Sequence, residues 1–134
     1  MFRISEAANL AIHAVAFLAA NESGELVPAA AIAERLGCSP SHLAKVLNSL
    51  ANRGFVSSSR GARGGYGLTV SRDGITAYDV LAAVDGELPE NGCLLGQPIC
   101  QGSACAFQDL FADVRELFIR RLQEVRLVDI PIRS

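Results

Sequence analysis

Three of the four cysteines in this 134-residue chain fall within thirteen positions, at Cys93, Cys100 and Cys105. Three glycines and a proline lie in the same stretch, residues 92–107, so we expect a loop rather than a regular helix or strand. Thiolates are soft ligands that suit iron–sulfur clusters, and the glycines would let three of them converge on one small group. Zinc is the competing metal, but the two close cysteine pairs typical of a structural zinc site are missing.

A metal-free role for the same cysteines stays open, because thiols can switch reversibly between reduced, disulfide and sulfenate forms. A small redox enzyme or an iron–sulfur carrier is a more remote alternative. No Cys-x-x-Cys pair is present, and no recognisable motif places a base beside a nucleophile. Cys38 stands apart from the other three, and we interpret it as a small buried apolar residue.

No apolar run approaches the roughly 20 residues needed to cross a bilayer, so no membrane partner is expected. The apolar N-terminus is interrupted by polar residues and lacks the early basic cluster of a signal peptide. We therefore expect a cytoplasmic protein, and a reducing compartment of that kind favours metal or redox roles for clustered cysteines over structural disulfides.

The charges are unevenly distributed, although the net charge is only −2. Residues 35–72 hold six basic side chains and no acidic one, whereas all 14 acidic residues lie outside this window. A local basic region of this kind is typical of a nucleic-acid interface that the average charge conceals.

Two short helices are predicted inside this basic window. Pro28 opens one that stops at Gly37, and Ser39 with Pro40 starts a second that runs to about Asn52. The second has one apolar face, while its outer face offers Ser41, His42, Lys45 and Asn48. This pattern predicts a helix-turn-helix whose second helix can enter a major groove.

A β-hairpin is predicted next, at about residues 55–70, with a tip that carries Arg60 and Arg63 among glycines. Glycines keep the tip slim, so its arginines can enter a minor groove or contact phosphates. The fold class expected is therefore mainly α with a small β-hairpin: a winged helix-turn-helix with a long C-terminal dimerisation helix.

The final helix is predicted from about Cys105 to Leu127 and carries a broad apolar stripe. A small winged domain has little core left to cover such a helix, so we expect part of the stripe to pack against a second copy. The expected interface consists of Phe111, Val114, Leu117, Phe118, Leu122 and Val125. The domain prediction is residues 1–86 for DNA binding, 87–105 for a cysteine-rich sensor loop, and 106–134 for the dimerisation helix and tail.

These segments together resemble the IscR/NsrR-type regulators, a bacterial family of iron–sulfur-cluster regulators and nitric-oxide-sensitive repressors. The matching residues are Ala30 to Ala33 with Leu36, the helix SHLAKVLNSL, the wing RGARGGYGL from Arg60, then Ile75, Asp79, Val80 and the three-cysteine loop. The resemblance implies a homodimeric transcription factor that holds a cluster, of 2Fe-2S or 4Fe-4S type, through Cys93, Cys100 and Cys105.

The same resemblance implies that a fourth ligand comes from elsewhere. One branch of the family has a histidine three positions after the last cysteine, where this chain has Gln108. Other members use the first helix of the second copy, which points to His13 of the partner subunit or Asn9 of the partner subunit. An ordinary partly buried histidine remains the alternative for His13, and Glu6 of the partner subunit is an outside candidate for the ligand.

The expected function is that of a DNA-binding regulator, in particular a repressor, and not an enzyme. Its affinity for a double-stranded operator of two-fold symmetry would respond to nitric oxide, oxygen, redox state or iron–sulfur status through the cluster. The residues expected to contact DNA are Ser39, Ser41, His42, Lys45, Asn48, Arg53, Arg60, Arg63, Gly64, Gly65 and Tyr66.

Overall fold

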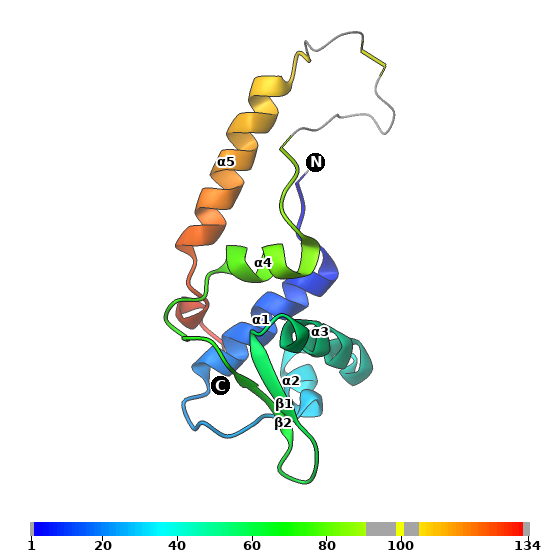
Figure 1. Cartoon of the computed structure of the whole chain (residues 1–134), viewed down its shortest axis with the longest axis vertical. Helices are drawn as coiled ribbons and strands as arrows, with labels where there is room; N and C mark the ends of the chain where they lie inside the picture. The colour runs from blue at the N-terminus through cyan, green and yellow to red at the C-terminus, as the bar shows by residue number, and fades with distance from the viewer. Residues whose placement is uncertain (1, 91–98, 101–104, 133–134) are drawn as a thin grey trace.

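The computed structural model describes residues 2–90, 99–100 and 105–132. Within them the chain folds mainly into helices with one antiparallel hairpin, as predicted (Figure 1). The elements are, in order, α1 (Glu6–Ala20), α2 (Ala29–Leu36), α3 (Pro40–Asn52), β1 (Val56–Ser59), β2 (Gly65–Leu68), α4 (Ala77–Asp85), α5 (Gln108–Glu124) and the 3₁₀ turn η1 (Leu127–Asp129).

Helix α1 is the centre of the core. Eight of its 15 residues are buried, and it packs against α2, α3, α4 and η1. Its N-terminus is capped twice, because the Ser5 hydroxyl accepts the N–H of Ala8 and the Asp85 carboxylate accepts the N–H of Ser5 at 3.1 Å. The second bond joins the start of α1 to the end of α4, immediately before the segment that leads to the cysteines.

The helix-turn-helix is formed by α2 and α3 and follows the local sequence signals. Gly37 ends α2 in the left-handed region at φ 69°, which a glycine adopts without steric cost. The Ser39 hydroxyl then caps α3 by accepting the N–H of His42 at 3.1 Å. The buried face of α3 consists of Leu43, Val46, Leu47 and Leu50.

The hairpin pairs Val56 with Leu68 and Ser59 with Gly65. It is also tied to the chain before α2, since Val27 and Tyr66 exchange both backbone hydrogen bonds, at 2.8 and 2.9 Å. At Gly65 (φ 146°) a Cβ would lie 2.5 Å from the Val27 carbonyl, so only glycine permits this close approach. The wing is therefore fixed to the body at its base.

Helix α5 is shorter at both ends than the predicted range of residues 105–127. It ends at Glu124 because the next residues pair with the chain around the start of α4. Ala77 N–H donates to Val125 O at 2.9 Å, and Leu127 N–H donates to Ile75 O at 3.0 Å. Leu127 is then fully buried against α1. The tail, assigned from sequence to the dimerisation unit, thus packs on the core of residues 1–86.

Figure 1 shows α5 extending away from the helical body, with the N-terminal segment near it. Phe2 joins the two, since its ring stacks on Phe118 with centroids 6.0 Å apart and meets Phe111 edge-on at 6.4 Å. Throughout the described ranges, each helix is too short or too polar to span a lipid bilayer.

Candidate nucleic-acid interface and cysteine site

The outer face of α3 presents the side chains expected to read DNA. Ser41, Lys45 and Asn48 are exposed and His42 is half-buried, on the opposite side of the helix from its buried leucines. Ser39 is exposed as well, but its hydroxyl caps α3 and lies 3.1 Å from the Ser41 hydroxyl. Ser39 therefore shapes the start of the helix, whereas the residues after it are available to a partner.

Tyr66 and Asn48 make a contact that sequence reasoning did not reveal, although both were named as DNA-contacting residues. The Tyr66 hydroxyl donates to Asn48 Oδ1 at 2.8 Å and so joins the wing to α3. The Asn48 amide group keeps its two donors for another acceptor. A tyrosine in β2, 18 residues from its partner, gave no local signal of this pairing.

The wing tip is slim and positively charged. Arg60 and Arg63 are exposed, and a Cβ on Gly64 would lie 2.3 Å from Ser59 O, so the tight turn excludes any larger residue there. Within the described ranges, Arg72 is the only basic residue of the 35–72 window that forms an ion pair. The charges of Lys45, Arg53, Arg60 and Arg63 are thus free to attract phosphates.

Cys100 and Cys105 lie in segments at the opposite end of the molecule from the wing (Figure 1). Cys100 is exposed and Cys105 is half-buried, while Cys93 lies outside the described residues. Cys105 precedes α5 rather than starting it, because the N-cap is Phe107. Its sulfur accepts the N–H of Phe107 at 3.4 Å, and its carbonyl accepts the N–H of Gln108 at 3.2 Å. The Cys105 sulfur therefore has one backbone donor, from Phe107, just before the start of α5.

Cys38 lies in the helix-turn-helix turn, half-buried and packed against the core. The structure gives it a packing role there, far along the chain from the other cysteines.

His13 and Asn9 share one face of α1, as their spacing predicted. His13 Nδ1 lies 2.8 Å from the Asn9 carbonyl oxygen, which can only accept a hydrogen bond. A neutral His13 with its proton on Nδ1 satisfies this contact and leaves the lone pair of Nε2 available. Asn9 and Glu6 are exposed. Ligation by any of them stays a prediction.

The apolar stripe of α5 is only partly covered by the chain itself. Phe111 is buried, Val114, Phe118 and Leu122 are half-buried, and Leu110, Leu117 and Val125 are 44%, 47% and 41% exposed. Val125 lies just beyond the helix, as its C-cap, rather than on the helical stripe. The exposed members remain the candidates for contact with a second copy.

A helix-turn-helix, a basic hairpin fixed to its second helix and a long half-covered helix define a winged-helix DNA-binding regulator. The particular family follows from comparison with known proteins. The model of the Rrf2 family, described as iron-dependent transcriptional regulators, matches residues 4–131, and the chain belongs to this family.

The chain is 33% identical to the HTH-type transcriptional regulator IscR of Klebsiella pneumoniae over 126 residues, which cover 93% of this chain and 77% of that protein. It is similar in structure to CymR, the global cysteine regulator of B. subtilis, with a TM-score of 0.80, 26% identity and coverage of 97% and 96% of the two chains. The oxidized form of Staphylococcus aureus CymR gives a TM-score of 0.75 at 25% identity, covering 99% and 100%.

Membership of this family confirms the winged-helix fold and the prediction of a transcriptional regulator rather than an enzyme. It also supports DNA binding, whereas contact of DNA with α3 and the wing stays a prediction.

Proposed function

We propose that the chain acts as a homodimeric repressor whose affinity for a two-fold operator depends on an iron–sulfur cluster held by Cys93, Cys100 and Cys105. The observation that most supports a cluster is the environment of Cys105, whose sulfur accepts a hydrogen bond from the backbone N–H of Phe107. Hydrogen bonds to sulfur stabilise thiolate ligands and tune the potential of the cluster they hold.

Among the described residues no three candidate ligands lie together, so the proposed site needs Cys93 and the partner subunit in addition to Cys100 and Cys105. Cys100 is exposed and therefore accessible to iron, and the Cys105 sulfur already accepts a backbone hydrogen bond. His13 of the partner subunit would add a neutral nitrogen, since the bond from Nδ1 to the Asn9 carbonyl fixes the tautomer in which Nε2 can ligate. When bound, the cluster supplies a centre that reacts with nitric oxide or oxygen and is lost when iron is scarce.

The chain's own contacts offer a route from the cysteines to the DNA surface. The segment entering the cysteine region is held at both sides, because Asp85 binds Ser5 at the start of α1 and Arg115 of α5 donates to Leu88 O at 3.4 Å. Helix α1 in turn packs directly on α2 and α3. A change in how the cysteine region is held would thus reach the spacing of the two α3 helices, which two-fold operators require to match one turn of DNA.

The test of the cluster is an absorbance spectrum with iron and sulfide analysis of protein purified without oxygen. A visible band between about 320 and 460 nm is expected, and it should be lost in Cys93→Ala, Cys100→Ala and Cys105→Ala. Cys38→Ala is the matched control, because that thiol packs in the helix-turn-helix, and it should keep both colour and iron. Protein that stays colourless after reconstitution with iron and sulfide would refute the proposal.

Operator control is tested separately, by selecting bound sequences from random duplex DNA and titrating the selected site. Cluster loss is expected to weaken binding, and a reporter promoter carrying the site should become derepressed. Equal affinity with and without the cluster would contradict cluster control while leaving DNA binding intact.

A metal-free thiol switch is the second candidate, favoured by the exposure of Cys100 and by the structural likeness to CymR, which has been solved in an oxidized form. In this mechanism an oxidant converts a thiol to a sulfenate or a disulfide and thereby alters operator affinity. Mass spectrometry of iron-free protein after hydrogen peroxide treatment distinguishes the thiol switch from the cluster mechanism. Reversible oxidation of Cys100 or Cys105 that changes DNA affinity without any iron would favour the switch.

A further inference from the structure

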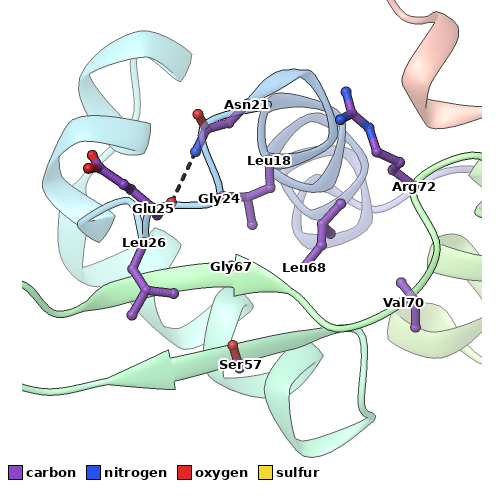
Figure 2. A pocket seen from close by; sticks show the side chains of 10 residues that line it. All are labelled: Leu18, Asn21, Gly24, Glu25, Leu26, Ser57, Gly67, Leu68, Val70 and Arg72. Atoms are coloured by element: carbon purple, nitrogen blue, oxygen red, sulfur yellow. Dashed lines mark hydrogen bonds between the residues drawn. The ribbon is translucent and has the colours of Figure 1, made fainter.

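A cavity of about 390 Å³ lies at the base of the wing, on β2, between the end of α1 and the turn that follows it (Figure 2). Gly67 creates the space. It pairs with Ser57 across the hairpin, and a Cβ at this position would come within 2.9 Å of the Leu26 side chain. A volume in the range of about 300 to 1,000 Å³ is usual for small-molecule sites.

The inner wall of the cavity is apolar and belongs to two separate elements. Figure 2 shows Leu18 projecting from α1 and Leu68 from β2 into the same space, with Val70 beyond them. Leu18 is buried, and Leu68 and Val70 are half-buried. An apolar ligand body placed between them would remove further carbon surface from water.

Arg72 supplies a positive charge at one edge of this wall. Its guanidinium contacts Glu22 at 3.3 Å, but the Glu22 side chain is 81% exposed, so this pair contributes little to stability and is easily exchanged. A guanidinium is well suited to bind a carboxylate, with which it can form two parallel hydrogen bonds.

The remaining polar groups narrow the ligand class. The Asn21 amide already donates to the Glu25 carbonyl at 3.1 Å, and Glu25 N–H donates to Ser23, so the turn satisfies its own backbone. Figure 2 shows the Glu25 carboxylate directed away from the space between Leu18 and Leu68. Its negative charge at the rim disfavours ligands with a second anionic group.

We propose that this cavity binds a small monocarboxylate with an apolar body, its carboxylate on Arg72 and its carbons between Leu18 and Leu68. This site is distinct from the cysteine region and does not depend on a cluster. A ligand there would contact β2 directly beside Tyr66, the residue that joins the wing to α3 and to the chain before α2.

The test uses hexanoate as the probe and hexan-1-ol as a probe of the same body without the charge, at constant ionic strength. The amide signals of Gly24, Gly67 and Leu68 in two-dimensional NMR report on the cavity in the intact chain. Hexanoate is expected to shift these signals saturably, with a dissociation constant on the order of 1 mM, and hexan-1-ol to bind more weakly.

Arg72→Gln removes the charge with little change in shape and should weaken hexanoate binding at least about tenfold. Arg121→Gln is the matched control, because it removes an arginine that also pairs with a glutamate, Glu124, on distant α5. It should leave hexanoate binding unchanged, and Glu22→Gln should leave it equal or stronger. Absence of saturable shifts at these amides, or equal affinity of the folded Arg72→Gln variant, would overturn the proposal.

Discussion

Helices α3 and α5 both carry an apolar stripe, but the chain covers only one of them. The four buried residues of α3 are at most 5% exposed, whereas α5 has one buried residue and leaves Leu110 and Leu117 44% and 47% exposed. A covered stripe stabilises the fold of one chain, and an uncovered one stabilises association. The DNA-binding end is therefore complete within one chain, whereas the cysteine end is expected to be completed by a second.

Truncating a leucine in each region tests this contrast with the largest expected effect. Leu47→Ala removes a fully buried side chain from the core and should lower the free energy of unfolding by about 3 kcal/mol, from transfer and cavity costs together. Leu117→Ala should change it by less than about 1 kcal/mol at chain concentrations where a dimer is dissociated. Urea unfolding followed by circular dichroism measures both free energies. Similar losses at the two sites would contradict the claim that the chain covers the stripe of α3 but not that of α5.

A charge on the uncovered stripe should affect association rather than folding. Leu117→Asp would bury two unpaired carboxylates in a two-fold interface and is expected to weaken the dimer about a hundredfold or more. Sedimentation velocity over a range of concentrations measures this. Ala112→Asp, exposed and on another face of α5, is the control and should stay dimeric. A Leu117→Asp variant that associates like the unaltered chain would exclude this stripe from the interface.

Asp85→Asn tests the contact between α4 and the start of α1, which connects the cysteine region to the DNA-binding end. The change removes the charge that accepts from Ser5 at the N-terminus of α1, and we expect a loss of about 1 kcal/mol in stability. If this link carries the response, the difference in operator affinity between cluster-loaded and cluster-free protein should also shrink. Fluorescence anisotropy with the selected operator measures that difference in affinity. An unaltered difference would show that the Asp85–Ser5 contact does not couple the cysteine region to DNA binding.

Tyr66→Phe has the smallest expected effect and lies wholly within the DNA-binding end. It removes the hydroxyl that donates to Asn48, which should lower the free energy of unfolding by about 1 kcal/mol or less, and loosens the contact between the wing and α3. DNA affinity should fall a few fold for all sequences alike. Asn48→Ala should instead alter sequence preference, because it also removes the amide donors from the face of α3. A binding-site selection in which Tyr66→Phe alters sequence preference and Asn48→Ala lowers affinity for all sequences alike would contradict these two roles.

The helix-turn-helix was predictable because its boundaries depend on adjacent residues. Gly37 provides the left-handed C-cap of α2, and Ser39 with Pro40 defines the first turn of α3. The basic tip of the wing was equally visible, since glycines and arginines at a turn are a local signal.

The features that the sequence did not reveal all join distant segments. The end of α5 is set by pairing between Thr76 and Arg126, and the wing is fixed by Tyr66 on Asn48. Phe2 stacks on Phe118 across the length of the chain. The cavity beside Gly67 likewise requires α1 and β2 to meet. Ligation by His13 of the partner subunit depends on a second copy and remains a prediction.

The burial of Leu127 has a consequence for the order in which the protein forms. This residue completes the core around α1, yet the ribosome adds it after the cysteine region and after all of α5. A nascent chain that has emerged only as far as its wing thus lacks a buried part of its own core. The helix-turn-helix and wing can reach their full stability only once the cysteine region and α5 have been synthesised, so a newly made chain already carries its cysteines before its DNA-binding end is complete.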